Sequence, residues 1–230
     1  MKQPVVDYKQ FRLRRLNEPQ YAHLKLLLGW VGYFILYFLT ENFIPEERLH
    51  VVHCFVDDLV PFNEVFVILY VSWYALIVIS LLIFMLYDIQ SFKDLSLYII
   101  ITQVVAMAVY ILYPTVQELR PAVFPRENFF TWVLGIIYAF DTPTGVCPSL
   151  HVAYSMGIAS VWLKKKDASR TWKAILVVWV VLICVSVLFV KQHSAVDVIA
   201  ALPLGLLAEC LVYRGRRSPS GGKKAKARPA

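Results

Sequence analysis

Charged residues are scarce in this chain. Asp, Glu, Lys and Arg make up 17% of the 230 residues, whereas hydrophobic residues make up 59%. The stretch from Val65 to Tyr87 contains no charged residue at all. Helices of soluble domains carry a polar face, so this scarcity argues against a soluble protein. About 20 apolar residues in a helix span the hydrocarbon core of a bilayer, and several such runs recur here.

The sequence also lacks a signal-peptide cleavage site, because no small-residue motif follows the first apolar run near 26–40. We expect that run to remain as a spanning signal-anchor. The pattern predicts an all-α membrane bundle of six helices, with a short interfacial helix at 129–140 that is too short to span. The predicted spans are 22–42, 65–87, 95–114, 149–164, 172–191 and 194–213. The predicted domains are a basic arm at 1–21, a catalytic membrane domain at 22–213 and a disordered basic tail at 214–230.

Basic residues fall mostly on one side of these spans. Only four of the 23 fall on the other side, namely Arg48, Arg120, Arg126 and Lys191. The positive-inside rule then predicts that both termini are cytoplasmic. The excess charge is thus a topology signal, and we predict no nucleic-acid partner. We expect a multi-pass protein of the inner membrane of a bacterium.

Cysteine is scarce too. The chain has four cysteines, and they show no paired spacing. Cys184 and Cys210 lie in apolar runs, where cysteine packs as a small hydrophobe. Cys54 and Cys147 both fall on the predicted outer side, where a disulfide is chemically feasible.

Histidine and acidic residues near Cys54 have spacings that would place them on one face of a helix. No second ligand pair accompanies His50, His53 and Asp57, and an amphipathic surface helix explains them equally well. We therefore assign no metal site and no cofactor.

Polar residues from distant segments converge on the predicted outer side. His193 and Asp197 are four residues apart, so on a helix they share a face. A carboxylate on one ring nitrogen fixes the tautomer and leaves the other nitrogen free to attack. His151, at a predicted helix start, could protonate a leaving oxygen. Asp57, Asp58 and Asp141 either border the site entrance or cap and solvate loops.

Two further residues fit phosphate binding. Ser149 and the backbone N–H groups at the same helix start form a cradle for phosphate oxygens. Arg120 supplies a cation that can bind two oxygens at once. The set indicates phosphoryl transfer.

These motifs resemble those of the type 2 phosphatidic acid phosphatase superfamily. Arg120-Pro121, then Pro148-Ser149-Leu150-His151, then His193-x-x-x-Asp197 are similar to KxxxxxxRP, PSGH and SRxxxxxHxxxD in order, spacing and membrane side. The resemblance implies His193 as the nucleophile of a phosphohistidine, Asp197 as its orienting group and His151 as the general acid and then base. It also implies that Ser149 and Arg120 hold the phosphoryl oxygens.

Three positions depart from the family pattern. Tyr113 replaces the first-motif lysine, Val187 replaces the arginine of the third motif, and Leu150 replaces the glycine of PSGH. Lys191 lies one turn beyond Val187 and, if the helix continues, could supply the missing cation. Fewer cations also suit a phosphodiester, as in the divergent lipid phosphotransferases that make sphingomyelin or inositol phosphorylceramide.

Three functions follow as hypotheses. The first is metal-independent dephosphorylation of a phospholipid or polyprenyl phosphate at the outer leaflet. The second is transfer of a phosphorylated headgroup between lipids. The third is a non-catalytic lipid-binding protein, against which the retained His193, Asp197 and His151 argue. Neither the lipid nor the oligomeric state follows from the sequence.

Overall fold

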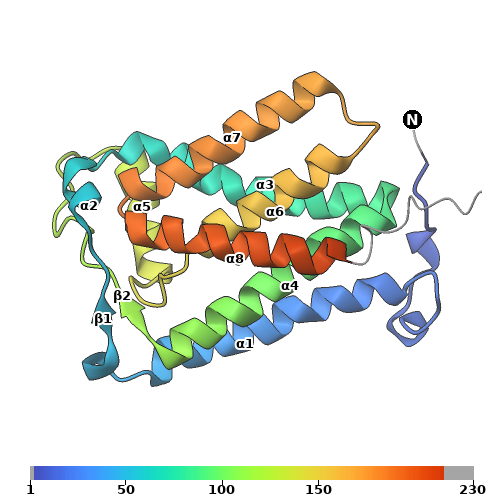
Figure 1. The fold of residues 1–230 in the computed structure, drawn as a ribbon, viewed down its shortest axis with the longest axis horizontal. Helices are drawn as coiled ribbons and strands as arrows, with labels where there is room; N and C mark the ends of the chain where they lie inside the picture. The colour runs from blue at the N-terminus through green and yellow to red at the C-terminus, as the bar shows by residue number, and fades with distance from the viewer. Residues whose placement is uncertain (1–2, 215–230) are drawn as a thin grey trace, which may run out of the picture.

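The protein is a bundle of helices that run roughly side by side (Figure 1). The computed structural model describes residues 3–214, apart from the side chains of residues 41 and 42, so the predicted tail lies almost entirely outside the described residues. The long helices are α1 Leu28–Phe43, α3 Val67–Tyr87, α4 Ile89–Leu112, α6 Leu150–Lys164, α7 Arg170–Phe189 and α8 Ala195–Tyr213. The shorter elements are η1 Tyr8–Gln10, η2 Leu13–Arg15, η3 Ala22–Leu27, η4 Glu46–Arg48, β1 His50–Val51, α2 Phe55–Leu59, η5 Glu64–Phe66, β2 Thr115–Val116 and α5 Phe129–Phe140.

The predominantly helical fold class is confirmed. Within the described residues, five helical segments are long and apolar enough to cross a membrane: Ala22–Thr40, Glu64–Tyr87, Ile89–Leu112, Arg170–Phe189 and Ala195–Tyr213. Helix α6 has only 15 residues and packs against α3, α4, α7 and α8. Because its neighbours surround it, α6 is the central helix of the bundle. The six-span count stays a prediction.

Close approach of backbones at the bundle centre depends on small residues. At Gly157 of α6, an added Cβ would lie 2.4 Å from the Tyr98 ring of α4, so only glycine fits there. The buried core extends from this contact through Phe84, Ile158 and Leu176, which join α3, α6 and α7. This packing fixes the start of α6 relative to its neighbours.

Of the helix boundaries that differ from the predicted spans, two have a clear local cause. Helix α4 begins at Ile89 rather than at 95, because the Asp88 carboxylate caps it by accepting from the Ser91 N–H at 3.0 Å. Helix α7 ends at Phe189 rather than at 191, and Lys191 adopts a left-handed φ of +53°. Helix α5 has the predicted bounds, but its interfacial placement stays a prediction.

One end of the bundle carries the irregular segments. Strand β1 pairs in parallel with β2, and His50 in β1 stacks on Tyr113 with ring centroids 4.1 Å apart. His50 and Asp57 therefore do not share a helical face, because His50 lies in β1 and Asp57 in α2. Cys54 and Cys147 are free thiols, so the disulfide is not formed.

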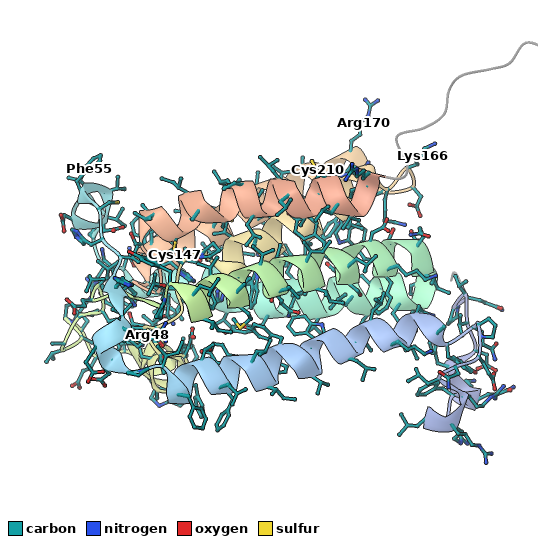
Figure 2. All side chains as sticks on the ribbon, turned by 60° about the horizontal axis from the view of Figure 1, so that its bottom comes forward. Arg48, Phe55, Cys147, Lys166, Arg170 and Cys210 are labelled. Atoms are coloured by element: carbon teal, nitrogen blue, oxygen red, sulfur yellow. The ribbon has the colours of Figure 1, made fainter. Side chains whose placement is uncertain are left out.

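The opposite end carries the basic α6–α7 connection and the N-terminal arm. Figure 2 shows Lys166 and Arg170 at this end, far from Cys147 at the other. The arm packs on the ends of α3 and η3, where the Tyr8 hydroxyl donates to the Met85 carbonyl at 2.8 Å. The two ends of the bundle thus differ in chemistry.

Candidate active site

The turn between α7 and α8 holds the predicted nucleophile. His193 Nδ1 lies 3.2 Å from Asp197 Oδ2, and the same oxygen accepts from the Ser194 N–H at 2.9 Å. Asp197 is fully buried, whereas His193 is 8% exposed. A carboxylate on Nδ1 selects the tautomer whose Nε2 carries a lone pair, which is the arrangement that a nucleophilic histidine requires.

His151 faces His193 across the site. The two ring centroids are 5.7 Å apart, and His151 also packs against Trp73 and Tyr70 with centroids 4.1 and 4.6 Å away. Its Nε2 is buried and has no hydrogen-bond partner among the described residues. An imidazole held in this way can exchange a proton with a substrate oxygen once one is bound.

Ser149 joins the starts of two helices. Its backbone N–H donates to the Asp197 carbonyl at 3.1 Å, and its hydroxyl caps α6 by accepting from the Val152 N–H at 3.4 Å. Because Ser149 is fully buried, it fixes His151 relative to Asp197. Phosphate binding by Ser149 stays a prediction.

Arg120 reaches the site from the loop before α5. Its guanidinium donates to the carbonyl oxygens of Asp141 at 2.6 Å and Tyr138 at 3.3 Å, and to the side-chain oxygen of Gln192. It also lies 4.4 Å from the centroid of the Tyr138 ring. Burial lowers the pKa of Arg120, and the charge of Asp141 opposes that shift. Gln192 directly precedes His193, so a cation lies beside the nucleophile turn.

Lys191 is directed elsewhere. Its ammonium donates to the carbonyl oxygens of Asp57 at 2.9 Å and Val60 at 2.5 Å, at the end of α2. The expectation of a continuing helix is wrong, because α7 ends at Phe189. The role of Lys191 as a phosphate-binding cation stays a prediction, and these contacts do not favour it.

Val187, where the family motif has an arginine, has a structural role. Val187, in place of the arginine, is fully buried against Val67, Tyr70 and Leu134. Its carbonyl accepts from the His193 N–H at 3.2 Å and so supports the turn. An arginine side chain at this position would have to enter an apolar cluster.

Asp57 is the most important residue whose role the sequence did not reveal. Its Oδ2 accepts from the Ser194 hydroxyl at 2.5 Å and the Cys54 N–H at 2.8 Å, while Oδ1 accepts from the Ala195 N–H at 2.8 Å. Burial raises the pKa of this carboxyl, but these hydrogen bonds outweigh burial and hold the pKa below its usual value. Asp57 therefore clamps the start of α8 from a segment far away in sequence.

A cavity opens beside His151. It has a volume of about 660 Å³, lies between α1 and α3, and includes Asp141 and Leu150 in its lining. The Asp141 carboxylate accepts from the hydroxyls of Tyr37 and Tyr70, each at 3.2 Å. Asp141 therefore borders this cavity, and its place at a site entrance stays a prediction.

The model of the PAP2 superfamily matches residues 92–218, which is more than half of the chain. The chain belongs to the PAP2 superfamily. This family includes phosphatases and related phosphotransferases, and the apolar helices fit a membrane-embedded member. The match covers Arg120, Ser149, His151, His193 and Asp197, whereas α1 to α3 precede it. No curated protein and no solved structure matched the chain.

Proposed function

We propose that this PAP2-superfamily protein removes phosphate from a membrane lipid phosphate or pyrophosphate through a phosphohistidine at His193. The observation that carries the proposal is the pair of His193 Nδ1 and Asp197 Oδ2 at 3.2 Å, opposite a buried His151 whose Nε2 has no hydrogen-bond partner among the described residues. A nucleophile, its orienting carboxylate and an acid–base group are the minimum set for covalent phosphoryl transfer.

The reaction has two balanced steps. His193 Nε2 attacks phosphorus, the bond from phosphorus to the lipid or pyrophosphate oxygen breaks, and His151 gives its proton to that oxygen. His151 then takes a proton from water, whose oxygen attacks phosphorus and breaks the bond to His193. Arg120 would balance the charge that develops on the phosphoryl oxygens in both steps.

A second function is transfer of a phosphorylated headgroup to a lipid hydroxyl. The small number of cations near the histidines favours it. Lys191 binds the carbonyl oxygens of α2, and Val187 replaces the arginine of the family motif. Within the part of the chain that the structure describes, Arg120 is then the cation that remains near the turn of His193. One cation suits a phosphodiester better than a dianionic monoester.

The reactive face is proposed to be extracytoplasmic, because the basic α6–α7 connection lies at the other end of the bundle (Figure 2). Single cysteines at Glu127 and Ser169, in a background without native cysteines, test this orientation. An impermeant thiol reagent added to intact cells should label position 127 and spare position 169. The reverse pattern would reject the orientation.

The chemistry is tested by incubating the full-length protein in EDTA with phosphatidic acid, phosphatidylglycerol phosphate, a polyprenyl pyrophosphate and a phospholipid–ceramide pair. Release of free phosphate supports the phosphatase, and a new phosphorylated ceramide supports transfer. Each activity should disappear in the His193→Ala variant. Turnover that persists in this variant would contradict both functions.

A further inference from the structure

The residue before the predicted nucleophile is a buried amide. Gln192 directly precedes His193 in the turn between α7 and α8, and it is 3% exposed. An amide that is removed from water costs free energy unless both its oxygen and its nitrogen find partners. The partners of Gln192 therefore indicate what its side chain does in the site.

The two ends of this amide contact groups of opposite charge. The side-chain oxygen of Gln192 accepts from the Arg120 guanidinium, and the side-chain nitrogen donates to Asp141 Oδ2 at 3.3 Å. A guanidinium only donates and a carboxylate only accepts, so one orientation of the amide satisfies both. The two charged groups thus fix the amide, and the amide holds the two charged groups at one separation.

Without Gln192, the guanidinium would be bound only to the end of α5. Its other hydrogen bonds go to the carbonyl oxygens of Tyr138 and Asp141, which belong to the last turn of α5 and the residue after it. Among the hydrogen bonds of the described residues, the one to Gln192 joins the guanidinium to the turn that carries His193. This contact therefore sets where the cation lies relative to the nucleophile.

The loop that carries Arg120 contacts the nucleophile turn at two successive residues. Gln117 Nε2 donates to the Lys191 carbonyl at 3.0 Å, and Arg120 donates to Gln192. The first contact attaches the loop to the backbone of the turn. The second is made by the guanidinium itself, so it determines the position of the charge.

The nitrogen end of the amide leads to the acid–base group. Asp141 also accepts from the Tyr70 hydroxyl at 3.2 Å, and the Tyr70 ring stacks on His151 with centroids 4.6 Å apart. Arg120, Gln192, Asp141, Tyr70 and His151 thus form one continuous series of contacts. Such a series can keep a cation and an acid–base group at fixed relative positions across the site.

We propose that Gln192 is a positioning residue, which fixes the Arg120 guanidinium relative to His193 through one end of its amide and relative to the general acid through the other. The proposal rests on the proposed function, because that function gives Arg120 and His193 their roles. It goes beyond that function, since residue 192 occupies an unspecified position of the third family motif. A displacement of about 1 Å in a phosphate-binding group can cost about 100-fold in rate.

Gln192→Met tests the proposal, because methionine has a similar length but no hydrogen-bonding amide. With the lipid that the wild type turns over fastest, kcat/KM should fall about tenfold, and the larger part of the loss should be in kcat. Gln103→Met is the matched control. Gln103 is also 3% exposed, lies in α4, and has an amide nitrogen without a partner among the described residues. Both variants should have similar unfolding midpoints, and only Gln192→Met should lose activity.

Gln192→Glu separates the two ends of the amide. The titratable groups in hydrogen-bond contact with this side chain are Arg120, Asp141 and Tyr70. A carboxyl at position 192 keeps the acceptor for the guanidinium, but at about pH 8 it is ionised and repels Asp141. At about pH 5 the two carboxyls share a proton, which restores a donor toward Asp141. The ratio of kcat/KM in this variant to that in the wild type should therefore rise about tenfold as the pH falls. Taking the ratio cancels the titration of the two histidines, which both proteins share.

Binding of orthovanadate, which resembles the phosphoryl group in the transition state of transfer, tests the same contact without turnover. The full-length Gln192→Met protein should bind vanadate about tenfold more weakly than the wild type, and Gln103→Met should bind it equally well. Equal affinity of Gln192→Met and the wild type would overturn the proposal, as would a wild type that binds no vanadate.

A ratio in Gln192→Glu that does not change with pH would also overturn the proposal, because the contact with Asp141 would then have no effect on the reaction. Absence of lipid turnover in a wild type whose vanadate affinity depends on Gln192 would reject the proposed function and support the positioning role.

Discussion

The two halves of the site are held in very different ways. On the nucleophile half, Asp197, Asp57 and the Val187 carbonyl together bind the backbone or side chains of residues 193–195. On the phosphate half, Arg120 extends from a loop, and its Nε is buried without a hydrogen-bond partner among the described residues. The nucleophile half is thus held through several side chains, whereas the phosphate half depends on Arg120 alone, whose terminal nitrogens donate to Tyr138, Asp141 and Gln192.

This difference separates the residues that the proposed covalent transfer requires from the cations that match the charge of the substrate. Covalent transfer requires His193, Asp197 and His151 in fixed relative positions whatever the substrate is. The number of cations follows the charge of the phosphate instead. Under the proposed function, we therefore expect the loss of the family lysine and arginine at Tyr113 and Val187 to change the substrate before it changes the reaction.

The largest effect is expected on the nucleophile half. His193→Ala should abolish turnover, because it removes the atom that attacks phosphorus. The thermal unfolding midpoint and the elution volume in detergent should stay close to those of the wild type. More than a few per cent of the wild-type rate in the panel assay would contradict the assignment.

Asp197→Asn should lower kcat roughly 10⁴-fold, by analogy with histidines whose tautomer is mis-set. The amide can present an N–H to Nδ1, which would leave the wrong ring nitrogen protonated. Steady-state kinetics and the pH profile should both change. A loss of less than tenfold would contradict the orienting role and leave Asp197 only its cap at the start of α8.

The phosphate half should respond in a graded way. Arg120→Gln should lower kcat/KM by about 10–100-fold, corresponding to one or two charge-assisted hydrogen bonds, and Arg120→Lys should lower it less. If both variants kept wild-type kinetics, the structure would have no identified cation for the phosphate.

Asp57→Asn tests the clamp on α8. Replacing one acceptor oxygen by an amide should lower kcat about tenfold, because Ser194 or Ala195 loses a charged acceptor and the His193 turn loosens. KM should change little, since Asp57 does not border the phosphate. Asp58→Asn, at an exposed carboxylate paired with His53, is the control and should behave as the wild type.

The smallest effect is expected at Lys191. Its ammonium binds carbonyl oxygens, so Lys191→Met should lower the unfolding midpoint by a few degrees and change kcat/KM less than tenfold. A selective loss of about 10–100-fold in kcat/KM would instead support the alternative in which Lys191 replaces the family arginine.

The sequence predicted the helices well because apolar runs of membrane length leave few alternatives. It missed the start of α4, which Asp88 caps, because the first turns contain polar residues and an apolar run does not mark them as helix. It missed the end of α7 because the left-handed backbone at Lys191 leaves no trace in an apolar pattern.

The candidate site was predicted as far as its motifs extend. His151, His193 and Asp197 could be named from spacing, and the structure brings them together. The contacts of Asp57 with α8 and of Tyr37 with Asp141 join residues more than 100 positions apart, and they depend on how the helices pack. No local pattern encodes such contacts.

The central claim is covalent transfer through His193, and trapping the intermediate tests it most directly. The protein is mixed with the lipid of the panel that it turns over fastest, labelled with ³²P on the reacting phosphorus, and the reaction is quenched in alkaline detergent. The account predicts label that is stable to alkali and labile to acid, maps to the peptide containing His193, and is absent from His193→Ala. Acid-stable label on Ser149 would contradict it. So would the absence of trapped label from an active protein whose single turnover is resolved in time.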